Sequence, residues 1–344
     1  MNRLPRPDTE LLGRTLGGRY AVRSLLGSGG MGAVYEAVDL VGAVPVAIKG
    51  LNRRSFTPAN LRRLRFEAEI ASTLVHEHIC RVHGIGVDGG APYLVMERLE
   101  GETLRSLLRR EGALGPADAI AIMLQVLDAL SVAHAARIIH RDVKPSNIFL
   151  TRVSGSASPH VKLIDFGLAK AVGSSGDGDV EEITALNEIA GTPQYLTPEQ
   201  LLGERNLDAR VDVWAAALTL FEMLTGRRAQ ATALVPEALA ERILREPVPS
   251  IATERRDLPR EIDDVLQHAL AKDRRRRFSS AAAFRTALVA VWARHRAGSI
   301  ARGRSMYRAP PAPRSGWMKV AVSGRTVPTM SGRRPPGSGE NPRK

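Results

Sequence analysis

Hydrophobic and polar residues follow two different patterns along the chain. Near the N-terminus, "RYAVRSLLGSGGMGAVYEAVD", "VPVAIKGL" and "PYLVMERL" are short apolar runs around a glycine-rich turn, which is typical of β-strands. From Gly101 onward, segments such as "ADAIAIMLQVLDALSVAHAAR" and "DVWAAALTLFEMLTG" indicate buried helices. The sequence therefore predicts an α+β fold with two lobes and a cleft between them. The small β-rich lobe covers 20–96, and the larger, mainly helical lobe covers 97–293.

The two ends of the chain differ from this globular part. Residues 1–19 are expected to form an N-terminal extension. Residues 294–344 are rich in Pro, Gly and Ser and lack the apolar content that could offset the entropy of ordering, so they predict a disordered tail. From His295 to Lys344 there are eleven Lys or Arg and one acid, so this segment holds +10 of the net charge of +13. The charge lies in a solvated tail, and nucleic acid is not an expected partner.

The remaining composition is that of an ordinary soluble protein. The chain has 344 residues, of which 44% are hydrophobic and 25% charged. Its single cysteine, Cys80, excludes an internal disulfide and suits a reducing compartment. No N-terminal apolar segment predicts a signal peptide, and no apolar run is long enough for a transmembrane helix. We expect a cytoplasmic protein with no transmembrane segment.

A glycine motif lies between the first two predicted strands. In "LGSGGMGAV", Gly27, Gly29 and Gly32 form G-x-G-x-x-G, and the missing side chains let backbone N–H groups approach phosphate oxygens. A tight hairpin turn would have the same pattern. The dinucleotide-binding version needs a helix directly afterwards, whereas "AVYEAVD" continues as a strand, so that version is disfavoured.

The next strand ends with a lysine. Lys49 in "VAIK" stands 17 residues beyond Gly32, where it could lie beneath the same loop. The alternative is a surface lysine on a strand. The segment "TPANLRRLRFEAEIASTLVH" predicts a helix that carries Glu67 and Glu69, either of which could pair with Lys49. Solvated carboxylates on a helix face are the alternative for both.

The stretch "IIHRDVKPSNIFL", residues 138–150, places polar groups between two apolar runs. An alcohol that attacks phosphorus needs a carboxylate to receive its proton and cations to offset charge on the phosphoryl group. Asp142 and Lys144 provide these groups. The amide oxygen of Asn147 suits a hard cation such as Mg²⁺, as does Asp165 in "VKLIDFGLAK". Either stretch alone could be a polar turn, but both together, after the glycine loop and the lysine strand, indicate phosphoryl transfer.

In this order and combination, the motifs from Tyr20 to Ala293 resemble those of eukaryotic-like (Hanks-type) serine/threonine protein kinases of bacteria. The resemblance implies the bilobal protein-kinase fold, ATP and Mg²⁺ as cofactors with Mn²⁺ as a substitute, and a role in signal transduction. It implies transfer of the γ-phosphoryl group to Ser or Thr hydroxyls of protein substrates. Lys144 fits the Ser/Thr class, because tyrosine kinases typically have an Ala-Ala-Arg pattern here.

The resemblance also implies roles for single residues. Asp142 would be the catalytic base, and Lys144 would contact the γ-phosphate. Lys49 would hold the α and β phosphates and pair with Glu67, which lies nine residues before His76, the spacing that such kinases show.

For the nucleotide and metal, the resemblance implies a larger set. Asn147 and Asp165 would be the Mg²⁺ ligands, Met96 the gatekeeper, and Glu97 and Leu99 the hinge contacts to adenine. Val34, Ala47 and Leu150 would sandwich the adenine. The full set expected around ATP is Leu26, Gly27, Ser28, Gly29, Gly30, Met31, Gly32, Ala33, Val34, Ala47, Lys49, Met96, Glu97, Leu99 and Leu150.

The resemblance gives three further residues structural roles and one a regulatory role. Glu199 in "GTPQYLTPEQ" would form a buried pair with Arg277, and Asp212 would tie a central helix to the backbone of the catalytic loop. Thr192 would bond near the catalytic residues.

The segment between Asp165 and Glu199 is too long for a passive connection and is expected to be regulatory. Arg141 carries a positive charge that needs an anion, which in kinases with this Arg-Asp pair is typically a phosphate on the activation loop. Thr184 is the leading candidate for autophosphorylation, followed by Ser174 and Ser175. Self-association would allow this reaction in trans. In the alternative, acidic residues of the same loop satisfy Arg141 and the enzyme is constitutively active.

Two other functional classes compete with the kinase interpretation. A pseudokinase scaffold would usually lack Lys49, Asp142 or Asp165, and all three are present. A small-molecule phosphotransferase would not be expected to carry "GTPQYLTPEQ". Among the departures from the family pattern, Arg137 occupies a position where Gly is usual, which costs on the order of 1 kcal/mol if the backbone there is left-handed. No departure removes a catalytic group.

Overall fold

The computed structural model describes residues 11–29, 32–51, 65, 68–69, 71–151, 159–166, 193–204, 206–230 and 236–301. Contacts within the chain define two units, Met1–Gly298 and Ser299–Lys344, and the fold and the site belong to the first. Several predicted features lie outside the described residues. They are the tail beyond residue 301 and the site residues Gly30, Met31, Glu67, Thr184 and Thr192.

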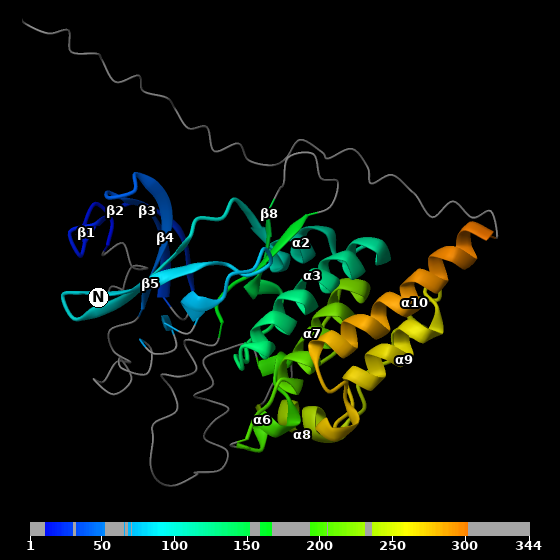
Figure 1. Ribbon diagram of the computed structural model, residues 1–344. Helices are drawn as coiled ribbons and strands as arrows, with labels where there is room; N and C mark the ends of the chain where they lie inside the picture. The colour runs from blue at the N-terminus through cyan, green and yellow to red at the C-terminus, as the bar shows by residue number, and fades with distance from the viewer. Residues whose placement is uncertain are drawn as a thin grey trace, which may run out of the picture. The chain divides into compact units, whose positions relative to one another are not determined.

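The N-terminal part is a six-stranded antiparallel sheet of order β1-β2-β3-β4-β6-β5. Its strands are β1 (Thr15–Leu16), β2 (Tyr20–Gly29), β3 (Gly32–Asp39), β4 (Val44–Leu51), β5 (Val82–Asp88) and β6 (Ala91–Glu97). Figure 1 shows them at one end of the unit, with the helices at the other. Because β1 pairs with β2 and buries Leu16, the sheet begins ahead of the predicted boundary at Tyr20.

Alternation along the strands defines two faces of this sheet. Every second residue of β3 is buried, and that face packs into one apolar cluster, made up of Leu16, Val22, Ala33, Tyr35, Ala37, Val46, Ile48, Tyr93 and Val95. Cross-strand partners project from the same face. The register pairs Val34 with Lys49 and Ala47 with Met96, so these four residues share the opposite face. The helical residue Ala68 packs over part of that second face.

Helices dominate the rest of the unit. They are α2 (Leu104–Glu111), α3 (Pro116–Ala135), α6 (Pro198–Leu201), α7 (Arg210–Thr225), α8 (Pro236–Arg245), α9 (Arg260–Ala269) and α10 (Ala281–Ala301). Short 3-10 turns are η2 (Pro145–Asn147), η3 (Pro193–Tyr195), η4 (Ile251–Thr253) and η5 (Arg274–Arg276). A small antiparallel sheet consists of β7 (Gly101–Thr103), β8 (Ile148–Thr151) and β9 (His160–Leu163).

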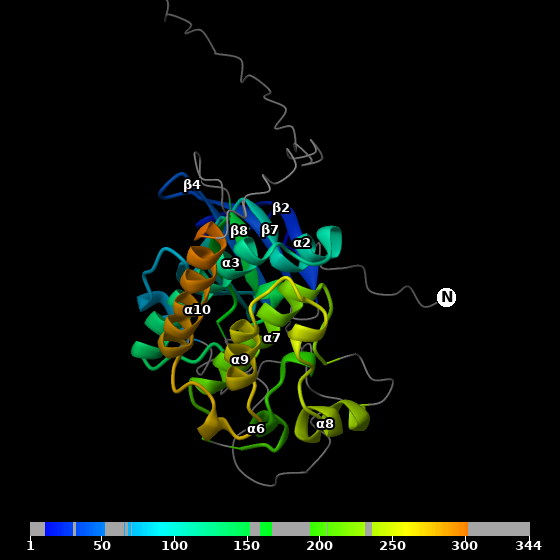
Figure 2. The same ribbon diagram turned by 90° about the vertical axis from the view of Figure 1, so that its right-hand side faces the viewer.

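Helix α7 is the centre of the helical lobe. Every residue from Val211 to Leu224 is buried, so the helix is surrounded by protein on all sides. It contributes to one large core that also takes in apolar residues of α2, α3, α9 and α10. Figures 1 and 2 both show α7 running alongside α3 and α9. The predicted α+β architecture, a β-rich lobe followed by a helical lobe, is confirmed.

Among the described helices, α3 is long and apolar enough to cross a membrane, with a mean hydropathy of 1.5. Half of this apolar window is buried inside the protein, where α3 packs against α7 and β9. The core helix of a soluble domain passes the same test, so α3 is weak support for a membrane span.

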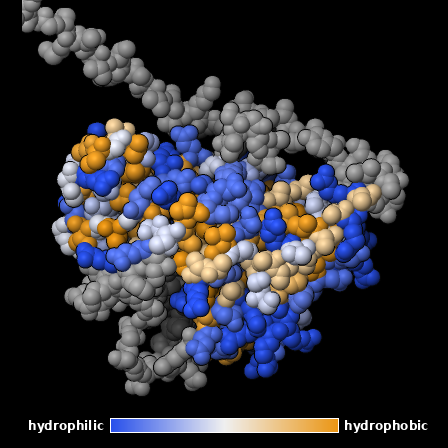
Figure 3. All heavy atoms as spheres, viewed as in Figure 1, coloured by the Kyte–Doolittle hydropathy of each residue, from blue (hydrophilic) through white to orange (hydrophobic). Residues whose placement is uncertain are grey.

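The surface is polar around the short helices. In Figure 3, hydrophilic residues gather over the end of the unit that carries α6 and α8. Among large apolar side chains, Leu40, Val41 and Val44 at the turn from β3 to β4 are at least half exposed, and so is Leu202 directly after α6.

The small sheet depends on one glycine. Gly101 has a φ of 144°, and a Cβ atom there would lie 2.0 Å from the carbonyl oxygen of Leu150. Only glycine therefore allows β7 to approach β8 at this point. Because β8 follows the polar loop 138–147, this close approach also fixes where that loop ends.

The end of α3 is predicted to be strained. Arg137 has a φ of 61° and an exposed side chain, which confirms the left-handed conformation expected at this position. Replacing Arg137 with Gly should raise the free energy of unfolding by about 1 kcal/mol, because glycine adopts this conformation without a Cβ clash. Denaturant unfolding of wild type, Arg137→Gly and the control Arg137→Ala measures this. A gain for alanine equal to that for glycine would mean that loss of the arginine side chain, not backbone strain, is responsible.

Candidate active site

A buried carboxylate on α7 binds the backbone of the loop 138–147. Asp212, in the first turn of α7, is fully buried. Its Oδ2 accepts a hydrogen bond of 2.8 Å from the backbone N–H of His140, and its Oδ1 accepts one of 2.8 Å from that of Arg141. Nε2 of His134 on α3 donates to Oδ2 at 2.8 Å. These three bonds fix the backbone directly before Asp142.

Asp142 stands at the centre of a polar cluster. Its Oδ2 lies 2.7 Å from Nζ of Lys144 and accepts a 2.9 Å hydrogen bond from Nδ2 of Asn147. The same Nδ2 donates to the backbone carbonyl of Asp142 at 2.8 Å. Lys144 and Asn147 are buried, whereas the Asp142 side chain is 14% exposed. The carboxylate is therefore held in one orientation by two buried donors and still reaches the surface.

Asp165 reaches the same region from the end of β9. The backbone N–H of Ile164 donates to the carbonyl of Asn147 at 2.9 Å, so the two segments run together. Asp165 itself has a φ of 59°. Its Oδ1 lies 2.7 Å from Nζ of Lys49, whose side chain is 8% exposed. Residues from the sheet, from loop 138–147 and from the end of β9 thus meet in one place.

A buried histidine packs behind these groups. His140 is fully buried, its Nε2 donates to the carbonyl oxygen of Ile164 at 3.0 Å, and its ring lies 4.5 Å from that of Phe166. Burial lowers the pKa of His140, so the imidazole is neutral at pH 7. Its role is to join the loop before Asp142 to the segment that carries Asp165.

The described residues predicted around ATP lie on β2, β3, β4 and β6 of the large sheet, in the connection after β6, and on β8. Leu26, Gly27 and Ser28 at the end of β2 are exposed, and Gly29 pairs with Gly32 across the turn to β3. Val34, Ala47, Lys49 and Met96 share one face of the sheet, and Ala33 belongs to the opposite face. Leu150 is 6% exposed on β8. The predicted set therefore comes from both lobes, and Ala33 lies on the opposite face of the sheet from Val34, Ala47, Lys49 and Met96.

The predicted hinge carries two ion pairs. The carboxylate of Glu97 lies 3.0 Å from Nζ of Lys162 on β9, and Arg98 pairs with Glu36 on β3 at 3.1 Å. Leu99 is half-buried, and its carbonyl oxygen accepts a hydrogen bond from Arg98. The connection between the lobes is thus attached to each of them by side chains.

A second buried ion pair fixes the segment that follows the predicted activation loop. Glu199 on α6 accepts two hydrogen bonds from Arg277, of 2.7 and 2.8 Å, and both side chains are almost fully buried. The guanidinium also donates to the carbonyl of Ala271 at 2.8 Å and lies 4.7 Å from the ring of Trp214 on α7. The fork-to-fork geometry satisfies both charges, which burial requires.

One buried network was missed by the sequence interpretation. Arg105 on α2 donates to Glu222 on α7 at 2.6 Å and to the hydroxyl of Tyr195 at 2.7 Å, and that hydroxyl also bonds to Glu222. Burial raises the pKa of Tyr195. No local pattern could have revealed this contact, because Arg105 and Glu222 are 117 positions apart.

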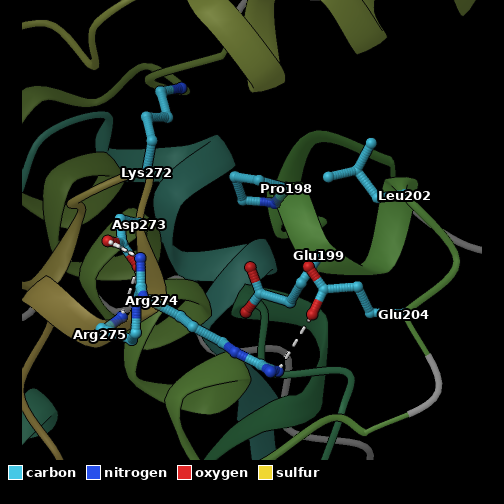
Figure 4. Close-up of a pocket in the computed structure, with 8 residues that line it drawn as sticks. All are labelled: Pro198, Glu199, Leu202, Glu204, Lys272, Asp273, Arg274 and Arg275. Atoms are coloured by element: carbon cyan, nitrogen blue, oxygen red, sulfur yellow. Dashed lines mark hydrogen bonds and ion pairs between the residues drawn. The ribbon is translucent and has the colours of Figure 1, made fainter.

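A cavity of about 340 Å³ lies beside the Glu199–Arg277 pair. Figure 4 shows its wall of three acids and three bases, in which Arg274 points toward Glu204 and Arg275 toward Asp273. It is lined by Pro198, Glu199, Leu202, Glu204, Lys272, Asp273, Arg274 and Arg275. None of these residues is predicted to contact ATP. Burial lowers the pKa of Lys272 to about 8, and its Nζ donates to the carbonyl of Ile243.

Comparison with known proteins agrees with this geometry. The family model for the protein kinase domain matches residues 20–289. The chain belongs to the protein kinase family. Similarity to bacterial relatives shows that it is a Hanks-type serine/threonine kinase. PknA of Mycobacterium tuberculosis is 36% identical over 343 aligned residues, which cover 94% of this chain and 75% of PknA. PknB of Mycolicibacterium smegmatis is 36% identical over 328 residues, covering 92% and 50% of the two chains.

Solved structures show the same fold. The PknI kinase domain of Mycobacterium tuberculosis matches with a TM-score of 0.64 and 27% identity, covering 82% of this kinase and 98% of that chain. Rad53 in complex with AMP-PNP matches with a TM-score of 0.63 at 24% identity, which supports the fold alone. The predicted bilobal kinase fold and the serine/threonine kinase class are confirmed.

We predict that Asp212→Asn loosens the loop before Asp142. An amide can place only one acceptor oxygen against the two backbone donors, and a buried donor left without a partner costs roughly 1–3 kcal/mol. Unfolding measurements should show this loss, and hydrogen exchange should show faster exchange at the amides of His140 and Arg141. Asp264→Asn, an exposed carboxylate on α9, is the matched control. Unchanged exchange at both amides in Asp212→Asn would contradict this role.

Proposed function

We propose that this kinase transfers the γ-phosphoryl group of ATP to Ser or Thr hydroxyls of protein substrates, with Mg²⁺ as its metal and Asp142 as the catalytic base. The observation that carries the proposal is the meeting of three segments. Lys49 lies 2.7 Å from Asp165, which follows β9, and β9 lies beside the loop that holds Asp142 and Asn147.

The proton-accepting role of Asp142 follows from how it is held. Asn147 and Lys144 both bind its Oδ2, so the carboxylate cannot turn freely. A carboxylate fixed in this way can accept the proton of a substrate hydroxyl and direct the hydroxyl oxygen toward phosphorus. Nζ of Lys144, which lies 2.7 Å from this carboxylate, would also offset charge on a transferring phosphoryl group.

The donor set also fits Mg²⁺. Asn147 uses its amide nitrogen for Asp142, which leaves its amide oxygen as the ligand atom, and Asp165 adds a carboxylate that is 29% exposed. Hard oxygen donors of this kind are those that Mg²⁺ prefers. When bound with ATP, the ion would offset the negative charge of the phosphates. Lys49 would then turn from Asp165 toward the α and β phosphates.

Control of the kinase is the finer part of the proposal. Arg141 has a φ of 62° and immediately precedes Asp142, so a phosphate bound by its guanidinium would act on the catalytic loop directly. We propose autophosphorylation at Thr184, in trans between self-associated copies, and a cytoplasmic role in signal transduction. The relatives named as serine/threonine-protein kinases support the activity on which this rests.

Replacement of Asp142 by Asn tests the catalytic assignment. Phosphotransfer to a protein substrate should fall by at least about a hundredfold, because positioned acid–base groups contribute 10²–10⁴ to the rate. Nucleotide affinity, measured by titration with a fluorescent ATP analogue, should stay close to that of wild type. Asp264→Asn should change neither quantity. A residual rate above about a tenth of wild type would exclude Asp142 as the base, since such a group contributes far more.

Phosphatase treatment tests the control by phosphorylation. Wild type stripped of phosphate should be less active and should regain activity on incubation with ATP and Mg²⁺, whereas Thr184→Ala should start low and stay low. Ser174→Ala and Ser175→Ala test the two other candidates, and Asn187→Ala, which removes no hydroxyl, is the control in the same segment. If stripped wild type and Thr184→Ala are both as active as untreated protein, the acidic residues of the loop satisfy Arg141 and no phosphate is needed.

A further inference from the structure

A group of possible metal ligands lies where the loop 76–80 meets β9, outside the residues assigned to ATP and Mg²⁺. Glu77, His78 and His160 each offer one ligand atom, and these atoms lie within 4.8 Å of one another. In the part of the chain that the structure describes, no other three His, Cys, Asp or Glu residues bring their ligand atoms this close together. Neither the kinase reaction nor the proposed control uses these three residues.

The hydrogen bonds of the two histidines leave one lone pair on each ring. Nδ1 of His78 lies 3.1 Å from the carbonyl oxygen of Val161, and Nε2 of His160 lies 3.0 Å from that of Glu77. Because a carbonyl oxygen only accepts, each of these nitrogens carries the ring proton. Nε2 of His78 and Nδ1 of His160 therefore carry the lone pairs. A backbone carbonyl that holds the second nitrogen is the usual support of a metal-binding histidine.

His76 shows why the neighbouring histidine is not a ligand. Its Nδ1 accepts a hydrogen bond of 3.2 Å from the backbone N–H of His78, so this lone pair is used. Its other ring nitrogen, Nε2, lies 3.7 Å from the carboxylate of Asp128. His76 packs against His78 with ring centroids 5.5 Å apart but has no nitrogen left for an ion.

The third candidate ligand is the carboxylate of Glu77. The Glu77 side chain is exposed, and its carboxylate makes no hydrogen bond or ion pair with any residue in the described ranges. His78 is 8% exposed, and its ring lies 4.7 Å from that of His160.

The backbone on both sides of the group is fixed. The N–H of Leu163 donates to the carbonyl of His78 at 2.8 Å, and the N–H of Cys80 donates to the carbonyl of Leu163 at 3.0 Å.

Zinc binds His nitrogen at about 2.0–2.1 Å, so tetrahedral ligand atoms lie roughly 3.3 Å apart. Rotation of the exposed Glu77 side chain and small tilts of the two rings can close the remaining gap.

We propose that Glu77, His78 and His160 form a binding site for a divalent transition metal, with Zn²⁺ as the ion that the ligands fit best. Two imidazoles and one carboxylate are typical of zinc and disfavour Mg²⁺, which prefers oxygen donors. The fourth position would hold water. Bound metal would link the loop before β5 to β9, so it would stabilise the attachment between the two lobes.

The test is zinc titration of the full chain after removal of metals by a chelator, with excess Mg²⁺ present to fill the nucleotide site. Competition with a chromophoric chelator measures affinity and stoichiometry. Wild type should bind one Zn²⁺, and Co²⁺ in its place should give the intense visible absorption of a tetrahedral site. His160→Gln should weaken Zn²⁺ binding more than about tenfold, because loss of a supporting group alone costs 10- to 100-fold.

Two further variants keep the outcome clear. Glu77→Gln changes only an exposed side chain, so it should fold normally and still weaken binding. His83→Gln removes an exposed histidine on β5 outside the group and should leave the affinity unchanged. Zinc should raise the melting temperature of wild type and His83→Gln but not of His160→Gln. The proposal is overturned if wild type binds no zinc, or if all variants bind it with the same affinity.

Discussion

The active region of this kinase depends on one buried carboxylate. Asp212 has no contact with solvent, and its charge is stabilised by two backbone N–H groups and one imidazole. A buried carboxylate without such donors would be strongly destabilising. The need to satisfy this charge therefore determines the path of residues 140–141. That path in turn determines where Asp142 and Asn147 lie. Through the hydrogen bond between Ile164 and Asn147, it also determines where the chain enters Asp165.

The dependence extends to both lobes through short steps. Loop 138–147 continues into β8, which pairs with β9, and β9 leads to Asp165. Asp165 then reaches Lys49 on the sheet of the other lobe at 2.7 Å. Each step is a backbone pairing or a charge pair, so a change in the position of α7 would be transmitted to the sheet. Burial of α7 on every side resists such a change.

Local patterns in the sequence were enough for the fold and for the types of residue in the site. Short apolar runs around a glycine-rich turn predicted β3 and β4, and the polar stretch around Asp142 stood out between apolar runs. Long-range pairs were different, because no periodicity connects Glu199 with Arg277, and these came only from the resemblance to kinases. The contact of Arg105 with Glu222 and that of His78 with His160 were missed for the same reason. Their partners meet only when helices and strands have packed.

The attachment of the lobes has a mechanical consequence. The chain crosses between them at residues 97–101, and hydrogen bonds join them again where Leu163 meets His78 and Cys80. The Lys49–Asp165 contact is made by side chains that can turn, so the two backbone attachments leave one easy rotation, about the line through both places. Other displacements would break backbone hydrogen bonds or deform the connecting chain. Opening and closing of the lobes should therefore follow a single path, whichever ligand drives them.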